Sequence, residues 1–336
     1  MHKNKTWEKK FIQTDNGRQE AVCPVIISAS RSTDIPAFHA EWFINRLKAG
    51  YVTWVNPFNR QEQYISFEKT RVVVFWTKNA KPLLPYLDEL DKRNINYYFQ
   101  YTINNYDKDL EPHIPELSER INTFKTLSNK IGKSRIIWRY DPLIITDKIS
   151  LDNLLSRIKK VGDELYQYTE KLVISFADIS NYKKVEDNLK RCKIDYKEFG
   201  DSDMNTIAKE INNLNKRWQL EVATCSENID LKSFGIKHNK CIDDELMHRC
   251  FSSDQELMKF LGYSNAIQIS MFDNNTRPIL KDKGQRKECG CIMSKDIGQY
   301  NTCGHLCVYC YANYSENIVK RNLDSISNRS AASILC

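Results

Sequence analysis

Five of the eleven cysteines of the chain fall close together towards its carboxyl-terminal end. Three of them, Cys303, Cys307 and Cys310, form a C-x3-C-x2-C motif in which Tyr309 directly precedes the third cysteine. Three thiolates on one short loop can bind three irons of a cubane [4Fe–4S] cluster and leave the fourth iron open to another ligand. Three are too few for the closed tetrahedral shell of a structural zinc ion unless a further side chain joins them. The motif therefore predicts a cluster site with one open iron.

Four further cysteines come from three separate segments of the chain. They are Cys225, Cys241, Cys289 and Cys291. Four thiolates are the number required by a fully ligated iron–sulfur cluster or by a structural zinc ion. We interpret this set as a second iron–sulfur cluster and keep zinc as the alternative.

His305 lies inside the C-x3-C-x2-C motif. Together with His248 it would allow a mixed cysteine and histidine zinc site. A histidine between cysteines more often donates a hydrogen bond to sulfur, and we expect that role here.

Polar and charged side chains directly follow the apolar runs of the sequence. Helix caps and turns are one explanation for them, and Asp34 stands where an N-cap residue belongs. Burying a charged side chain directly after a strand costs free energy unless the charge is paired or binds a ligand. We therefore expect a substrate or cofactor pocket at this edge of the sheet. The candidate catalytic residues are Arg31, Asp34, Lys78, Arg139, Asp141 and Glu227.

Short apolar runs alternate with helical stretches of about ten residues or more. Strands are predicted over residues 25–28, 51–55, 72–76, 97–103, 135–140, 172–176 and 219–224. Helices are predicted over 37–47, 82–90, 114–131, 151–161, 183–192 and 203–218, the first ending at Gly50. Further helices are expected near 243–248, 255–261 and 313–323. The alternation indicates βαβ units and a parallel sheet.

The number of such units favours an α/β fold in the form of a complete or partial (β/α) TIM-like barrel, with an open doubly wound sheet as the rival. We expect an amino-terminal extension over residues 1–22 and the barrel-like domain over 23–235. Residues 236–336 would form a helical, cysteine-rich segment that binds the cluster and packs on the barrel. In this architecture the polar residues after the strands would share one rim.

Composition excludes several classes of protein. Hydrophobic residues make up 41% and charged residues 28% of the 336 residues, so the chain is neither disordered nor fibrous. Lys and Arg exceed Asp and Glu by 50 to 43, a mild and dispersed excess that permits a polyanionic partner without requiring one. No apolar run is long enough to span a membrane, and no secretion signal is visible. We expect a soluble, cytoplasmic protein with reduced cysteines and no membrane partner.

The spacing of Cys303, Cys307 and Cys310, with Tyr309 between them, resembles the signature of the radical S-adenosylmethionine (SAM) enzymes. The resemblance implies that the three cysteines bind a [4Fe–4S] cluster whose open iron chelates SAM. An electron from the cluster would then cleave SAM to methionine and a 5′-deoxyadenosyl radical, which removes hydrogen from a substrate. It also implies that Tyr309, Tyr311 and Ser30 contact the cofactor, with Tyr309 on the adenine side.

Two features depart from the radical SAM pattern. The motif usually lies near the amino-terminal end, whereas here it occupies residues 303–310, and no Gly-Gly-Glu type motif follows. A circular permutation would explain its position. In that case the helix over 313–323 replaces the family's first helix, and the strand over 25–28 replaces its second strand.

A wider pattern resembles domain-of-unknown-function family 1848 (DUF1848). It is carried by residues 27–38, 75–79, 139–142, 225–227, 285–291 and 294–300, the last running into the cysteine motif. The resemblance covers about residues 25–313. It implies a radical-SAM-like iron–sulfur cluster and leaves the reaction open.

We therefore expect a radical SAM-type iron–sulfur enzyme with [4Fe–4S] and SAM as cofactors. Its substrate is unknown, and phosphate-bearing molecules and nucleic acid are the classes considered. An electron donor such as flavodoxin or ferredoxin would be its partner. The alternative is a zinc-stabilised protein that binds nucleic acid or takes part in DNA repair without radical chemistry.

Overall fold

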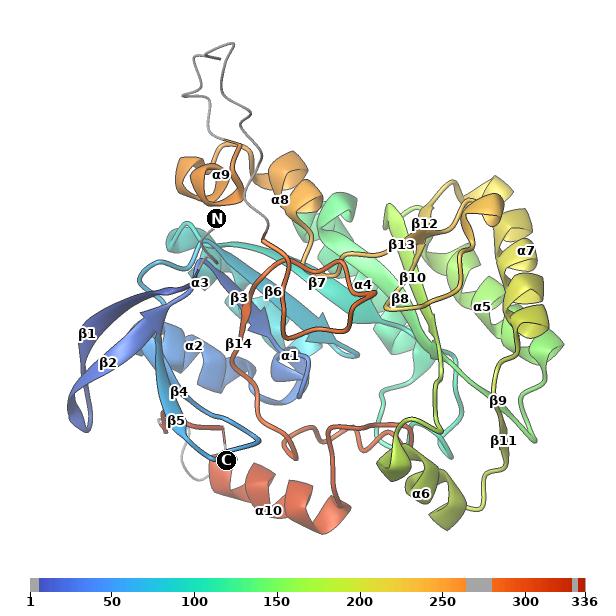
Figure 1. The fold of residues 1–336 in the computed structure, drawn as a ribbon, viewed down its shortest axis with the longest axis horizontal. Helices are drawn as coiled ribbons and strands as arrows, with labels where there is room; N and C mark the ends of the chain where they lie inside the picture. The colour runs from blue at the N-terminus through green and yellow to red at the C-terminus, as the bar shows by residue number, and fades with distance from the viewer. Residues whose placement is uncertain (1–5, 264–279, 328–331, 336) are drawn as a thin grey trace.

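The computed structural model describes residues 6–263, 280–327 and 332–335 of the chain. Its centre is a sheet of eight strands in which every hydrogen-bonded pair runs parallel (Figure 1). The order across the sheet is β13 (Lys237–His238), β12 (Glu221–Thr224), β10 (Lys171–Phe176), β8 (Ile136–Leu143), β7 (Asn96–Thr102), β6 (Val72–Thr77), β3 (Ile26–Ala29) and β14 (Lys295–Asp296). Within the described residues β13 and β14 do not pair with each other, so the sheet is consistent with an open or partial barrel.

One face of the sheet is covered by helices that follow the strands. Alternate strand residues such as Val73 and Phe75 of β6 point to this face and join the larger apolar core. The helices that pack on it are α1 (Ile35–Phe38), α2 (Ala40–Ala49), α3 (Leu87–Lys92), α4 (Leu117–Ile131), α5 (Leu151–Leu165) and α7 (Asp201–Trp218). Helix α6 (Lys183–Arg191) lies beyond one end of the sheet (Figure 1). The prediction that Gly50 stops a helix is confirmed, because Gly50 caps α2 with a φ of 83°.

The other face changes character along the strands, and we call it the cavity face. Near the amino ends of the strands, Val72 and Val74 pack with α8 (Asp244–Phe251) and α9 (Gln255–Leu261) in a second apolar core. Towards the carboxyl ends the same face carries buried polar side chains, among them Gln100 and Arg139. The apolar half of this face packs against the carboxyl-terminal segment. The polar half carries the side chains that could bind a ligand or react.

A smaller sheet lies beside the large one and accounts for most of the expected amino-terminal extension. Its order is β1 (Glu8–Thr14), β2 (Gly17–Cys23), β5 (Glu62–Ser66) and β4 (Tyr51–Val55). The sequence predicted a strand at β4, but as part of the parallel series; it lies in the smaller sheet and pairs antiparallel with β5. The hairpin of β1 and β2 and the strand β5 were not predicted. No residue of the predicted site belongs to the described strands of this sheet, but Trp54 of β4 contacts Lys295 of β14, with 3.5 Å between Nζ and the ring centroid.

The carboxyl-terminal segment runs along the molecule from α8 and α9 to α10 (Glu316–Ser327), which lies at the opposite end of the sheet near α6 (Figure 1). The helix expected over 313–323 is thus present, shifted by a few residues. The remaining short elements are β9 (Ile145–Thr146), β11 (Tyr196–Lys197) and the 3-10 turns η1 (Lys81–Tyr86), η2 (Lys133–Arg135) and η3 (Lys232–Phe234). In the described ranges, no helix combines the length and apolarity needed to cross a membrane.

Candidate functional site

A cavity of about 440 Å³ opens at the carboxyl ends of the parallel strands. All of the site residues predicted from the sequence line it, although Ser30 and Tyr311 are 281 positions apart in the chain. They are Ser30, Arg31, Asp34, Lys78, Arg139, Asp141, Cys225, Glu227, Cys241, Cys289, Cys291, Cys303, Cys307, Cys310, Tyr309 and Tyr311. The structure therefore brings these residues to one place, while their individual roles remain predictions.

The cysteine motif is positioned by β14, the short strand that precedes it. Asp296 of β14 lies beside Ser28 of β3 in a parallel pair. Its carboxylate accepts hydrogen bonds from Ser28 Oγ at 2.9 Å, Ser30 Oγ at 2.6 Å and the backbone N–H of Arg31 at 2.9 Å. The motif thus leaves the carboxyl end of a strand next to β3, as the circular permutation hypothesis requires. The hydroxyl of Ser30, predicted to contact the cofactor, donates to Asp296 instead of pointing freely into the cavity.

Asp34 joins three elements at the cavity wall. Its Oδ1 accepts the backbone N–H of Ala37 at 3.0 Å, so the N-cap explanation is correct for this residue. Its Oδ2 accepts the backbone N–H of Lys78 at 2.7 Å and Nε2 of His305 at 2.8 Å. Asp34 therefore ties α1, the end of β6 and the cysteine motif together.

His305 is held by Asp34 and by an edge contact of its ring with Phe38, at 4.6 Å between ring centroids. His248 lies in α8, stacks on Tyr263 at 3.9 Å and does not line the cavity. The structure does not bring the two histidines together, so it offers no support for a zinc site that uses both. The expected hydrogen bond from the His305 side chain to sulfur is also not seen among the described residues, because Nε2 is directed at the Asp34 carboxylate and Nδ1 has no partner.

Tyr309 belongs to a buried polar network beneath the cavity. Its hydroxyl donates to the carboxylate of Glu111, which also pairs with Lys78 Nζ at 2.9 Å. Asn104 Nδ2 donates to the Tyr309 hydroxyl at 3.1 Å, and Arg120 lies 4.0 Å from Glu111. Burial opposes ionisation of Glu111, but Lys78, Arg120 and the tyrosine hydroxyl outweigh it and hold the pKa of Glu111 below its ordinary value. The ring of Tyr309 faces the cavity from a fixed position.

A second ion pair lies on the cavity face. Arg139 Nη2 contacts Asp141 Oδ2 at 2.8 Å, and Ser175 donates a hydrogen bond to the other oxygen of Asp141. Burial would raise the pKa of Asp141, but Arg139 and Ser175 hold it below its ordinary value. The guanidinium groups of Arg139 and Arg31 each lie 5.3 Å from the centroid of the Trp76 ring. Trp76 thus stabilises two cations through its π-face.

Glu227 differs from the other carboxylates of the cavity. It accepts the backbone N–H of Phe176 at 2.9 Å. Burial raises its pKa to about 7 despite that hydrogen bond, and the charges of Cys225 and Asp141 act in the same direction. A carboxyl group with such a pKa can give or take a proton near neutral pH. This is consistent with the catalytic role predicted for Glu227.

The three sulfurs of the motif are buried beside the cavity. Burial raises the pKa of the thiols of Cys303, Cys307 and Cys310, so thiolates there need a compensating positive charge. The backbone N–H of Ala312 lies 3.3 Å from Cys310 Sγ. Among the described residues, no three His, Cys, Asp or Glu side chains converge as ligands of one metal ion.

The sequence did not single out Glu111 or Asp296 as site residues, and it indicated Asn104 only as one of the polar residues at the strand ends. Asn104 and Glu111 follow β7 in a loop, and Glu111 has no apolar run directly before it. Asp296 was part of the motif that carries the family resemblance, but only the structure shows its hydrogen bonds. All three are positioning residues that hold the cavity wall.

The fold and the cavity define an α/β protein with a cysteine-rich site at the carboxyl ends of a parallel sheet. The chain belongs to the DUF1848 family, a domain of unknown function, whose profile matches residues 26–312. This confirms the family resemblance read from the sequence.

Two further comparisons add little. No curated protein matches the chain. Among solved structures, a putative alpha-L-fucosidase from Bacteroides thetaiotaomicron VPI-5482 is 10% identical, with a TM-score of 0.21 and coverage of 64% of this chain and 86% of the other. At that score the likeness carries no argument about fold or activity.

Proposed function

We propose that this protein is a radical SAM-type iron–sulfur enzyme. Cys303, Cys307 and Cys310 would hold a [4Fe–4S] cluster through three of its irons. The observation that carries the proposal is that all three cysteines of a C-x3-C-x2-C motif line one cavity, at the edge of a parallel α/β sheet where cofactors commonly bind.

Two observations on the cavity fit this cofactor. A single ion held by three thiolates needs sulfurs about 3.8 Å apart, whereas a cubane places each cysteine on a different iron and tolerates a wider spacing. The motif sulfurs do not converge on one ion among the described residues. The buried Nη2 of Arg31 and Nδ1 of His305 have no hydrogen-bond partner within the described chain, so one guanidinium donor and one ring nitrogen remain for a ligand.

When bound, the cluster and SAM would supply reductive cleavage of the sulfonium and hydrogen removal from an unactivated carbon. The residues of this chain would position the cofactor, exclude water and exchange protons. Asp34 and Asp296 hold the cysteine motif against β3, and Tyr309 and Trp76 provide aromatic walls that keep water away. Glu227 can exchange a proton with a substrate near neutral pH.

The open parallel sheet would then correspond to a partial barrel with permuted chain order. In that reading β14 acts as the first strand, the motif follows it, α10 acts as the first helix and β3 as the second strand. The parallel pairing of Asp296 with Ser28 supports this order. A protein electron donor of the flavodoxin or ferredoxin kind would reduce the cluster.

The zinc-stabilised nucleic-acid-binding alternative has less support. Two of the cavity cations, Lys78 and Arg139, are already paired with Glu111 and Asp141 at 2.9 and 2.8 Å. Such pairs are poorly suited to binding phosphates, because the carboxylates compete for the cation.

The test is anaerobic purification, cluster reconstitution and reduction with dithionite in the presence of SAM. We expect a brown protein that releases 5′-deoxyadenosine, and Cys307→Ala should abolish the release while the far-ultraviolet circular dichroism is unchanged. Cys192→Ala is the matched control, because Cys192 is an exposed free cysteine outside the cavity. A colourless protein with stoichiometric zinc and no SAM cleavage would refute the proposal.

A further inference from the structure

We propose that Cys225, Cys241, Cys289 and Cys291 form a second metal centre with four thiolate ligands, and that it holds an iron–sulfur cluster. This site is separate from the C-x3-C-x2-C motif and does not depend on SAM chemistry. It would stand even if the function proposed above were wrong.

The first support is the grouping of the four sulfurs. Cys225 Sγ lies 3.5 Å from Cys241 Sγ, although the residues are 16 positions apart. The thiol of Cys241 also interacts with that of Cys291, which interacts with Cys289. All four line the cavity. The four thiols therefore form one group contributed by three segments.

The second support is the set of donors directed at these sulfurs. Arg139 Nη1 and Asn239 Nδ2 each lie 3.0 Å from Cys241 Sγ. The backbone N–H groups of Cys241 and Ile242 both point at Cys291 Sγ, at 3.3 Å. A neutral thiol is a weak acceptor, whereas metal-bound thiolates commonly accept hydrogen bonds of this kind. The pattern is typical of cysteines that are ligands.

The third support is the balance of charge. Four thiolates around Zn²⁺, or around an oxidised cluster of charge +2, leave a net charge of −2. Arg139 contacts Cys241 directly, and Arg31 lies close enough to Cys291 and Cys241 to interact with their charges. Arg139 also pairs with Asp141 at 2.8 Å, so its charge is shared between that carboxylate and the centre. The two guanidinium groups would therefore offset part of the negative charge, which lowers the cost of burying the centre.

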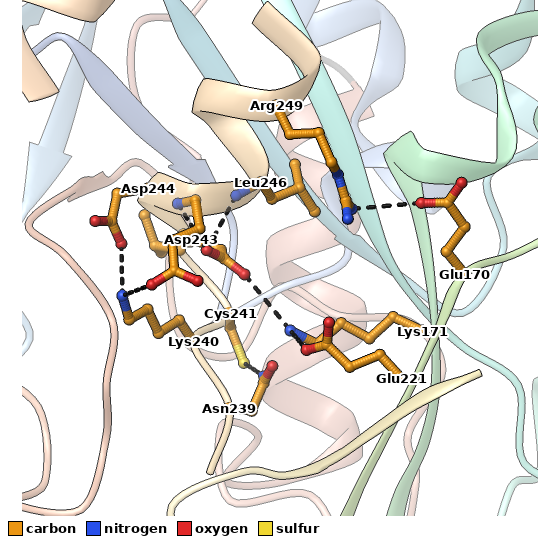
Figure 2. Close-up of polar contacts among 12 residues, drawn as sticks. Glu170, Lys171, Glu221, Asn239, Lys240, Cys241, Asp243, Asp244, Leu246 and Arg249 are labelled. Carbon is orange, nitrogen blue, oxygen red and sulfur yellow. Dashed lines mark hydrogen bonds and ion pairs between the residues drawn. The ribbon is translucent and has the colours of Figure 1, made fainter. Parts of the chain in front are cut away.

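The chain around Cys241 is fixed on its far side by ion pairs (Figure 2). Asp243 caps α8 through the N–H groups of Glu245 and Leu246 and reaches Lys171 Nζ at 3.5 Å. Lys240 pairs with Asp244 at 2.9 Å. Cys241 thus lies in a segment that is anchored on both sides before any metal binds.

Gly290 allows the other two cysteines to approach this segment. A Cβ at position 290 would lie 2.9 Å from Cγ of Lys240 and 3.1 Å from the carbonyl oxygen of Asn239. Both distances are shorter than ordinary van der Waals contact. The Cys-Gly-Cys loop therefore packs closely on residues 239–240, and a side chain between the cysteines would push it away.

A single zinc ion and a cluster require different spacings of the four sulfurs. Tetrahedral zinc needs all pairs of sulfurs about 3.8 Å apart around one point. Cys225 Sγ and Cys241 Sγ lie 3.5 Å apart, close to that spacing, but within the described ranges no three potential ligands converge on one ion. A cluster brings its own sulfides and spreads its ligands over several irons, so it does not require the four sulfurs to meet at one point.

The experiment uses the full chain with Cys303, Cys307 and Cys310 all changed to Ala, which removes the first site. After anaerobic reconstitution we expect about two to four irons per chain and absorption near 400 nm to remain. Adding Cys289→Ser and Cys291→Ser should remove both signals, whereas adding Cys192→Ser should leave them unchanged. Iron and zinc are counted by mass spectrometry of the protein, and SAM cleavage by the wild type is scored separately.

Gly290→Ala provides a variant that keeps all four thiols. It should reduce iron retention in the triple-alanine chain at least several-fold while the far-ultraviolet circular dichroism is retained. One zinc per chain that is lost with Cys289→Ser and Cys291→Ser would support the site but overturn the cluster. A metal-free triple variant, or a disulfide between Cys225 and Cys241 with no metal, would overturn the proposal.

Discussion

Nε2 of His305 lies 2.8 Å from the carboxylate of Asp34, although the two residues are 271 positions apart. This contact joins the loop after β3 to the middle of the cysteine motif. Both side chains are buried, so water does not weaken the interaction. The position of the motif therefore depends on a carboxylate that belongs to the other end of the chain.

Asp34→Ala should loosen the motif and lower its iron content. The change removes the helix cap and the acceptor for Lys78 and His305, and we expect a loss of about 3 kcal/mol in the free energy of unfolding. Asp254→Ala is the matched control, because Asp254 caps α9 and pairs with Arg71 away from the cavity. It should lower stability without lowering iron content. Equal iron loss in both variants would contradict a specific role for Asp34.

Lys78→Met should be strongly destabilising, because it leaves the buried carboxylate of Glu111 without its closest cation. Removal of one partner from a buried ion pair costs about 3–5 kcal/mol. Combining it with Glu111→Gln should recover part of this loss, since the uncompensated charge is gone. Denaturant unfolding of the single and double variants measures the coupling. If the two losses simply add, the pair is not the stabilising unit that the geometry indicates.

The ion pair of Glu111 also predicts a pH dependence. Burial disfavours its charge, but Lys78, Arg120 and Tyr309 keep its pKa in the folded chain below the ordinary value of 4.5. The unfolded chain therefore takes up the proton first as the pH falls. The stability contributed by ionised Glu111 is complete above that value and is lost as the pH falls through the folded pKa. The difference in unfolding free energy between wild type and Glu111→Gln should be constant from pH 7 to about pH 5.5 and should shrink below about pH 4.5. A difference that grows on acidification would contradict the assignment.

Gly298→Ala should disturb the connection between β14 and the cysteine motif. A Cβ there would lie 2.0 Å from Ser30 Oγ and 2.5 Å from Ser30 Cβ, and both belong to a buried side chain. Overpacking of this kind costs about 1–3 kcal/mol. Hydrogen exchange of residues 295–312 should accelerate in the variant, and Ser30→Gly in the same chain should partly reverse the effect. Unchanged exchange would show that the loop tolerates the displacement.

Much of the fold was predictable, because buried parallel strands are short apolar runs and their helices carry apolar stripes. Val72 to Trp76 and Leu172 to Phe176 were recognised in this way, and both lie in the large sheet. The two-residue strand β14 was not predicted from the sequence, because Lys295 and Asp296 have no apolar pattern. Its place is set by the hydrogen bonds of Asp296 to the loop after β3, which are contacts over long sequence distances.

The membership of the candidate site was predictable for a related reason. Residues that follow parallel strands meet at one edge whatever the details of packing, so Arg31, Lys78 and Arg139 could be placed from the strands alone. The buried polar network of Glu111 and Tyr309 beneath them could not be predicted from the sequence. Glu111 comes from a loop, and nothing in the sequence around it indicates that its side chain is buried with Tyr309.

The order of strands in the large sheet has a consequence for biosynthesis. Ribosomes make proteins from the amino-terminus, so seven of its eight strands are complete before β14 and the three cysteines that follow it emerge. The nascent chain can fold its sheet with that edge still bare, next to β3. Loading of iron at Cys303, Cys307 and Cys310 would then be a late event in maturation, which takes place on a scaffold that is already formed.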